Sequence, residues 1–179
     1  MEDRKHLTAE EVDRLIRAAG STGRHRDRDA LMILMGYRHG FRCSELVGLR
    51  RDQVDLKRGI LHVRRLKSGS PSTHPLSRRE VVGLKKMMKE STRGPLFVSE
   101  RGGALTRSSF EKMIERAGKL AGFEMKIHPH MLRHGCGYEL ANRGIDTRAI
   151  QDYLGHRNIQ HTVHYTKLAS NRFDGFFED

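Results

Sequence analysis

The chain has 179 residues, which is the size of one domain or of one domain with a short arm. It carries 34 Lys and Arg against 22 Asp and Glu, a formal net charge of +12. This balance favours nucleic acid as a partner before an anionic membrane, with a basic protein lacking a specific partner as the alternative. No long apolar run and only two cysteines argue against a membrane span, a signal peptide and a disulfide framework, so we expect a reduced, cytoplasmic protein.

The first 50 residues predict two helices and a short third one. LTAEEVDRLIRAAG, residues 7–20, begins with a capping box in which Thr8 is the N-cap and Glu11 returns the bond. DRDALMILMGYRHG, residues 27–40, predicts a largely buried helix that ends near Gly40. We expect Ser44 to cap a short helix over SELVGLR, residues 44–50.

The middle of the chain has a different pattern. GILHVRRLKSGSPSTHPLS, residues 59–77, alternates and then turns at Gly, Ser and Pro, which predicts a β-hairpin with Lys67 at the end of its first strand. A short extended piece is expected at LFVS, residues 96–99. Further helices are expected over residues 79–90, 108–121, 130–143, 147–155 and 159–169, with Gly144 and Gly155 as C-terminal stops. The fold class is therefore α+β, mainly α-helical, with a small antiparallel sheet at one side.

A cluster of basic side chains stands out in HPHMLRHGCGYEL, residues 128–140. His130 and His134 are four residues apart and share a helix face, as in zinc proteases. That motif requires a Glu after the first His, but Met131 is there, and Arg133 adds positive charge. A metal site is therefore weakly supported, although a zinc hydrolase stays open.

A phosphate explains both residue types in this cluster. Arg offers a planar fork that matches phosphate oxygens, and His can donate a bond or move a proton near neutral pH. Phosphoryl transfer needs more than one arginine, because its transition state gains negative charge. Taken singly, Arg42 in HGFRCSELVGLR and Tyr165 in LGHRNIQHTVHYTK would be ordinary surface or half-buried residues.

In combination, these residues resemble a known family. GFRCSEL, a hairpin lysine, HMLRH and LGHRNIQHTVHYT occur in the order and spacing of the tyrosine recombinase (phage-integrase family) catalytic domain. The resemblance runs from about Leu7 to Lys167. The stretches at 65–77, 128–148 and 150–163 are similar to the fimbrial phase-switch recombinases, which lack the family's separate N-terminal core-binding domain. We therefore expect residues 1–179 to form the catalytic domain alone, or a piece of a longer protein.

The resemblance implies a role for each residue of the site. Tyr165 is the expected nucleophile, which attacks the scissile phosphate in line and leaves a 3′-phosphotyrosyl link and a free 5′-hydroxyl. Arg42 and Arg133 would hold the non-bridging oxygens, and His130 would act as general base. The general acid for the leaving oxygen would be Lys67, with Arg65 as the competing candidate. The remaining site residue, His156, would bond the phosphate or position the tyrosine.

Other residues are expected to support this site or to stand outside it. Glu45 would support the arginine side, and His134 either orders the site or simply packs. No catalytic role is matched by His128, His161 or His164, for which we expect contact with the DNA backbone or with solvent. The two cysteines, Cys43 and Cys136, are expected to be small buried apolar residues.

The resemblance also implies partners and alternatives. We expect double-stranded DNA as substrate, no metal, no nucleotide, no membrane, and a homotetramer on two recombination sites that is a monomer or weak oligomer without DNA. In a bacterium the enzyme would join the nucleoid when bound. The C-terminal tail, residues 168–179, carries Phe173, Phe176 and Phe177 beside acidic residues and is expected to dock on a neighbouring protomer or on its own domain. A non-recombining DNA-binding regulator of the same fold and a type IB topoisomerase-like enzyme remain as alternatives to a site-specific DNA recombinase that inverts or integrates DNA.

Overall fold

The computed structural model describes residues 4–65 and 71–176. Within this part the chain forms helices and one small sheet, and the predicted class, α+β and mainly α-helical, is confirmed. The elements are α1 (Ala9–Ser21), α2 (Arg26–His39), α3 (Cys43–Val47), a short 3₁₀ turn (Arg51–Gln53), β1 (Val54–Asp55), β2 (Ile60–Val63), β3 (Ser72–Pro75), α4 (Arg78–Met87), α5 (Arg107–Leu120), α6 (Pro129–Asn142), α7 (Thr147–Leu154) and α8 (Gln160–Lys167).

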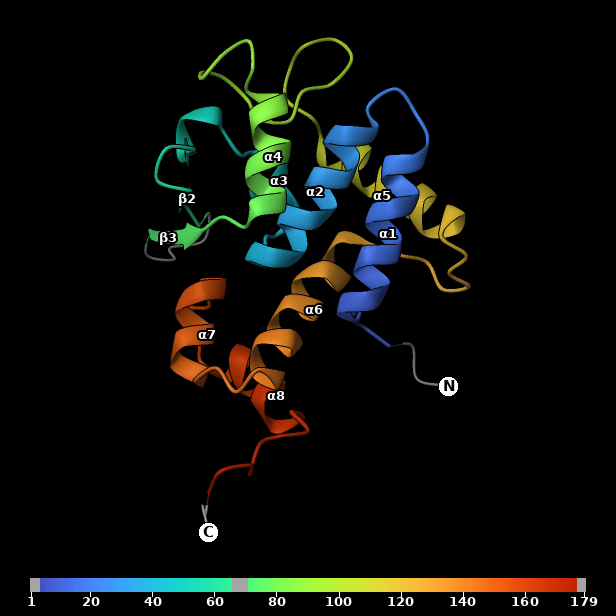
Figure 1. The fold of residues 1–179 in the computed structure, drawn as a ribbon. Helices are drawn as coiled ribbons and strands as arrows, with labels where there is room; N and C mark the ends of the chain where they lie inside the picture. The colour runs from blue at the N-terminus through green and yellow to red at the C-terminus, as the bar shows by residue number, and fades with distance from the viewer. Residues whose placement is uncertain (1–3, 66–70, 177–179) are drawn as a thin grey trace.

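The first two helices form the centre of the domain. At the start of α1, the Thr8 hydroxyl accepts a bond from the Glu11 amide, and the Glu11 carboxylate accepts one from the Thr8 amide, which confirms the predicted capping box. Residues 31–35 of α2 are all buried, because α1, α4 and α6 pack around this helix (Figure 1). Gly40 ends α2 in the left-handed conformation, with φ of 59°, as its position predicted.

The N-cap of the helix after this turn lies two residues earlier than expected. This N-cap is Arg42, not Ser44, because the Glu45 carboxylate accepts a bond from the Arg42 backbone amide at 2.9 Å. The carboxylate satisfies an amide that the start of a helix leaves without an intrahelical partner. The sequence signal of a capping serine was therefore wrong, and the consequence is that Arg42 lies at the corner between α2 and α3.

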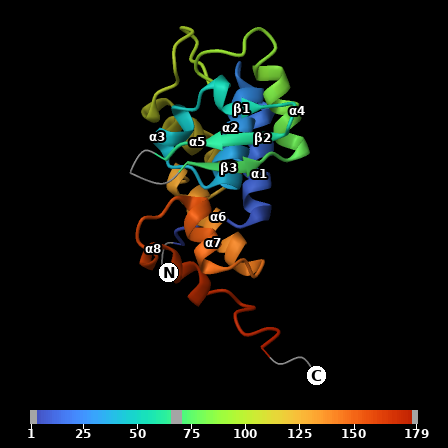
Figure 2. The same cartoon turned by 90° about the vertical axis from the view of Figure 1, so that its left-hand side faces the viewer.

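The predicted hairpin is confirmed as β2 and β3, which pair antiparallel with Leu61 opposite His74. The pair is extended by β1, which is too short to be recognised in the sequence. Figure 2 shows this sheet lying across α2, with α4 following from its edge. Lys67, which was expected at the end of the first strand, lies outside the described residues. Of the segment 96–99, which was expected to be extended, Val98 forms an isolated β-bridge with Ala104.

Two groups of buried apolar side chains meet along α6. The larger one lies among α1, α2, α5 and the sheet, and includes Phe97 and Phe110. The smaller one lies between the second half of α6 and the helices α7 and α8, and includes Cys136 and Tyr165. Figure 1 shows α7 and α8 against the lower half of α6, with α7 below β3. The candidate site lies where these two groups adjoin.

Beyond α8 the chain continues in turns and leaves the body of the molecule (Figure 1). Phe173 and Phe176 are 65% and 67% exposed, and their rings pack against each other at 5.5 Å. Among the described residues, none of the helices is long and apolar enough to cross a membrane.

Candidate active site

The first arginine of the site is held by a carboxylate. Arg42 donates from Nη1 to Oε1 of Glu45 at 3.0 Å, while its own side chain keeps 29% of its surface exposed. Burial by itself would raise the pKa of the Glu45 carboxyl, but Arg65 and Arg42 outweigh burial and hold that pKa below its ordinary value. The Glu45 side chain is therefore a fixed anion beneath Arg42, as its expected supporting role requires.

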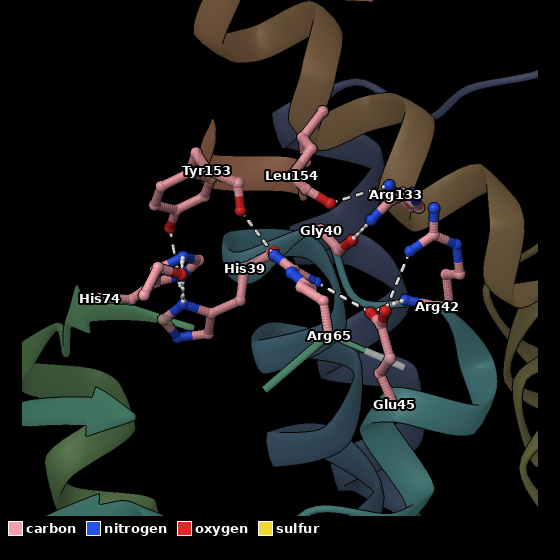
Figure 3. Close-up of polar contacts among 10 residues, drawn as sticks. His39, Gly40, Arg42, Glu45, Arg65, His74, Arg133, Tyr153 and Leu154 are labelled. Carbon is pink, nitrogen blue, oxygen red and sulfur yellow. Dashed lines mark hydrogen bonds and ion pairs between the residues drawn. The ribbon is translucent and has the colours of Figure 1, made fainter. Parts of the chain in front are cut away.

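The second arginine comes from the middle of α6. The Arg133 guanidinium is buried and donates to the carbonyl oxygens of Gly40 and, at 3.0 Å, Leu154. Both carbonyls stand at the C-terminal ends of helices, α2 and α7, where a cation is favoured. Burial, then Arg42 and Arg65, lower the pKa of Arg133 to about 10, so the side chain remains charged at neutral pH. Figure 3 shows the guanidinium groups of Arg133 and Arg42 beside each other.

His130 stands at the exposed start of α6, and a cleft of about 700 Å³ opens beside it and Arg42. Burial, then Arg133, lower the pKa of His130 below its ordinary value. Cationic side chains of Arg107, Lys112 and Lys126 line the cleft, together with the carboxylates of Glu111 and Glu115. The space is therefore open to solvent, and its walls are mixed in charge.

His156 follows the glycine that ends α7. Its Nδ1 lies 2.7 Å from the Thr162 hydroxyl, and its ring lies nearly parallel to that of Tyr165, with centroids 6.4 Å apart. Burial, then Arg133 and Arg42, lower the pKa of His156 to about 3. The imidazole is therefore neutral at neutral pH, and it lies within electrostatic reach of both arginines.

Tyr165 is buried on α8, with only 1% of its surface exposed. Its hydroxyl lies 2.8 Å from Nδ1 of His134, and its ring packs against the backbone of Gly137, where a Cβ would come within 2.5 Å of it. Burial raises the pKa of Tyr165 to about 12, although Arg133 acts in the opposite direction. The phenol therefore keeps its proton and can donate it to the His134 imidazole.

His134 is thus the imidazole that contacts the tyrosine. Burial, then His130 and His164, lower the pKa of His134 to about 4, which leaves its ring neutral and able to accept the bond. The expected base, His130, lies one turn earlier, with its ring centroid 4.9 Å from that of His134. The sequence left His134 open between ordering the site and packing. The structure places it against Tyr165, and the assignment of proton transfer remains a prediction.

The remaining predicted residues divide between the surface and the core. His128 and His161 are exposed, whereas the ring of His164 covers that of Tyr165 at 3.9 Å. Cys136 is buried as expected, but Cys43 is only half-buried, because it faces the cleft.

The structure gives one residue near the site a position that the sequence did not predict. Arg65, the competing candidate for the general acid, is buried and donates from Nη1 to Glu45 at 2.8 Å and from Nη2 to the carbonyl oxygens of His39 and Tyr153 (Figure 3). No local signal could have revealed this, since its partners come from three other segments. Within residues 4–65 and 71–176, no group of three His, Cys, Asp or Glu side chains is arranged to hold a metal ion.

Comparison with known proteins identifies the family of this chain. The model of the phage integrase family matches residues 5–172. The type 1 fimbriae regulatory protein FimB of Escherichia coli (strain K12) is 46% identical over 181 residues, which cover 98% of this chain and 90% of that protein. The crystal structure of XerA recombinase is 31% identical with a TM-score of 0.79, covering 94% of this chain and 62% of that one.

A second solved structure has the same fold at lower identity. The pre-cleavage complex of XerH site-specific recombinase with its difH substrate is 24% identical with a TM-score of 0.77, covering 91% of this chain and 50% of that one. The fold and the arginine, histidine and tyrosine groups together define the catalytic domain of a tyrosine recombinase. The chain belongs to the phage integrase family.

Proposed function

We propose that this enzyme is a site-specific recombinase of the fimbrial phase-switch kind, which breaks and rejoins double-stranded DNA through a 3′-phosphotyrosyl intermediate. The observation that carries the proposal is that four side chains from four different helices or their ends lie close enough to affect one another electrostatically. They are Arg42, Arg133, His156 and Tyr165. The likeness to FimB supports the phase-switch assignment, and the likeness to the DNA complex of XerH supports DNA as the substrate.

In this proposal the two guanidinium groups bind the non-bridging oxygens of the scissile phosphate and stabilise the charge that develops on them. Because His156 is neutral and lies beside both arginines, it donates a bond to the same phosphate. His130, at the open edge of the site, takes up the proton that leaves Tyr165, and His134 holds the phenol hydroxyl before that step. Lys67, outside the described residues, remains the proposed general acid.

The buried state of Tyr165 adds a conformational step. A hydroxyl on a side chain with 1% of its surface exposed does not reach a DNA phosphate, so α8 must shift when DNA binds. Ala169 packs against the smaller buried cluster and Asn171 donates to the Asn142 carbonyl, whereas Phe173 and Phe176 are exposed, so we propose that the chain beyond Asn171 follows such a shift. We further propose that the tail docks on a neighbouring protomer within a homotetramer on two DNA sites.

The experiment needs a cognate DNA, which is obtained by enriching fragments of the host genome that bind the protein. A suicide duplex of that site, nicked beside the scissile phosphate, is mixed with the protein in EDTA. The expected result is a covalent protein–DNA adduct on a denaturing gel that is absent with Tyr165→Phe. The matched control is Tyr138→Phe, which removes another hydroxyl from the same aromatic cluster and should keep the adduct.

Three outcomes would contradict the proposal in different ways. Specific binding with no adduct would favour the regulator that binds DNA without recombining it. An adduct that persists in Tyr165→Phe would refute the nucleophile. An adduct that forms without EDTA but not with EDTA would show that a metal takes part.

A further inference from the structure

We propose that Arg65 is a positioning residue that fixes Arg42, through Glu45, at its working place beside Arg133. The inference rests on the proposed function, since it concerns the same phosphate site. The chain of contacts is short: Arg65 Nη1 donates to Oε2 of Glu45 at 2.8 Å, and Oε1 of the same carboxylate accepts from Nη1 of Arg42 at 3.0 Å. One carboxylate is thus shared by a buried and a half-exposed guanidinium.

The Arg65 side chain is anchored more firmly than the Arg42 side chain. Only 1% of the Arg65 side chain is exposed, against 29% for Arg42. The second nitrogen, Nη2 of Arg65, donates to the carbonyl oxygen of His39 at 3.0 Å and to that of Tyr153 at 2.6 Å. These acceptors lie in the last turns of α2 and α7, so one planar group joins α2, α3 and α7.

The same end of α7 also holds the second phosphate arginine. Arg65 takes the carbonyl of Tyr153, and Arg133 takes that of the next residue, Leu154. Because two successive carbonyls of one helix end are bound by two guanidinium groups, the position of Arg65 is tied to that of Arg133 (Figure 3). Arg65 therefore relates the two arginines of the site to each other.

The acceptor on α7 is itself held in place. The ring of Tyr153 stacks on that of His74 from β3, with centroids 3.8 Å apart and planes at 10°. His74 in turn lies 2.9 Å, Nδ1 to Nδ1, from the buried His39. Gly155 packs directly on the stem of Arg65, where a Cβ would come within 2.6 Å of Cγ. Arg65 thus lies in a close-fitting buried environment and not in an adaptable surface position.

This arrangement gives Arg65 a specific effect on the reaction. Without it, the Glu45 carboxylate would be held only by the backbone amide and the guanidinium of Arg42, and that guanidinium could turn towards the cleft. A guanidinium displaced by about 1 Å from the phosphate loses much of its stabilisation of the transition state, a loss on the order of a hundredfold. Binding of DNA, which depends on many phosphate contacts, would change little.

The test compares two forms of the scissile phosphate under single-turnover conditions. One is the natural diester. The other is a methylphosphonate, in which a methyl group replaces one non-bridging oxygen and removes the negative charge that Arg42 and Arg133 neutralise. For Arg65→Gln we expect cleavage of the diester to fall by about tenfold to a hundredfold, and that of the methylphosphonate by no more than about threefold. The DNA concentration at half-saturation should stay within about twofold.

A matched control is Arg51→Gln. Arg51 also donates to two carbonyl oxygens, those of Pro95 at 3.1 Å and Ser91 at 3.0 Å, but it does so in a loop remote from the site. Arg51→Gln should lower the cleavage rates of the diester and of the methylphosphonate by the same factor, or leave both unchanged. If Arg65→Gln fails to fold, Arg65→Lys keeps the charge opposite Glu45 without the fork and carries the same comparison.

A double variant adds a second readout. When Glu45→Gln and Arg65→Gln are combined, the diester rate should fall no more than about threefold below that of the slower single variant, because both act through one contact chain. Equal losses of Arg65→Gln on the two DNAs, or losses that multiply in the double variant, would overturn the positioning role. A wild-type protein that forms no adduct on either DNA would instead refute the proposed function itself.

Discussion

Replacing Gly137 by Ala tests directly how Tyr165 is packed. An added Cβ would lie 2.5, 2.6 and 2.7 Å from Cε2, Cζ and Cδ2 of the Tyr165 ring, well inside the separation of about 3.5–4.0 Å that carbon atoms prefer. The ring must therefore move by about 1 Å. Relative to Gly, Ala stabilises a helix interior by about 1 kcal/mol, whereas overpacking a core costs about 1–3 kcal/mol.

We expect Gly137→Ala to lower the free energy of unfolding by up to about 2 kcal/mol, as the difference between these two effects. In the background of Tyr165→Ala the ring is gone, and the same change should raise the free energy of unfolding by about 1 kcal/mol. The matched control is Gly20→Ala in α1, where the new Cβ would meet only the Cβ of Ala30 at an ordinary 3.5 Å. This control should be neutral or stabilising.

The assay is urea unfolding followed by far-ultraviolet circular dichroism, with the four proteins of the double-mutant cycle measured together. The expected coupling energy between residues 137 and 165 is about 1–3 kcal/mol. If Gly137→Ala changed the free energy of unfolding by the same amount in both backgrounds, the ring would not lie against this glycine, and the buried position of Tyr165 would be refuted.

Three further predictions concern the surroundings of the site. Burial, then His39 and Arg65, lower the pKa of His74 to about 3. In the unfolded chain His74 takes up a proton as the pH falls below the ordinary pKa of about 6.5, whereas in the folded chain it stays neutral until the pH nears 3. The stability contributed by this difference is therefore present above pH 6.5 and is lost as the pH falls towards 3. Urea unfolding at pH 7.5 and pH 5 should show a loss about 2 kcal/mol larger in the wild type than in His74→Gln, and equal losses would contradict the shifted pKa. Arg133→Ala should lower the free energy of unfolding by about 2–5 kcal/mol, because two buried carbonyls lose their donor, whereas Arg42→Ala should lower it much less. Each variant should reduce cleavage by about a hundredfold or more. Equal free energies of unfolding for the two variants would argue against this difference in burial. Gly155→Ala, with φ of 69° and the stem of Arg65 in the way, should destabilise by about 1–3 kcal/mol in the same assay, and an unchanged midpoint would show that the α7 end is not packed on Arg65.

Much of the local structure followed from short stretches of sequence. The capping box of Thr8 and Glu11 and the helix stops at Gly40 and Gly155 were predicted, because each depends on residues within one turn of each other. The start of α3 was mistaken. Ser44 has the chemistry of a cap, but the Glu45 carboxylate reaches back to Arg42 and moves the start of the helix.

The choice of site residues depended on the order of motifs along the chain. Arg42, His130, Arg133, His156 and Tyr165 were selected from that order, and the structure gathers them where α6 meets the ends of α2 and α7. These residues come together in space because the two buried apolar clusters both pack on α6. No local sequence pattern indicates that arrangement.

The sequence by itself determined the family, the choice of the side chains that we propose bind the phosphate and attack it, and most helix ends, because these depend on residue type and near-neighbour spacing. Only the tertiary structure decided that Arg65 is a buried link and that His134, not His130, contacts Tyr165. The contact of Arg65 with Tyr153 joins residues 88 positions apart, and the contact of His134 with Tyr165 joins residues 31 apart. Such contacts arise from the packing of whole helices, so a buried arginine and an exposed one look the same in the sequence.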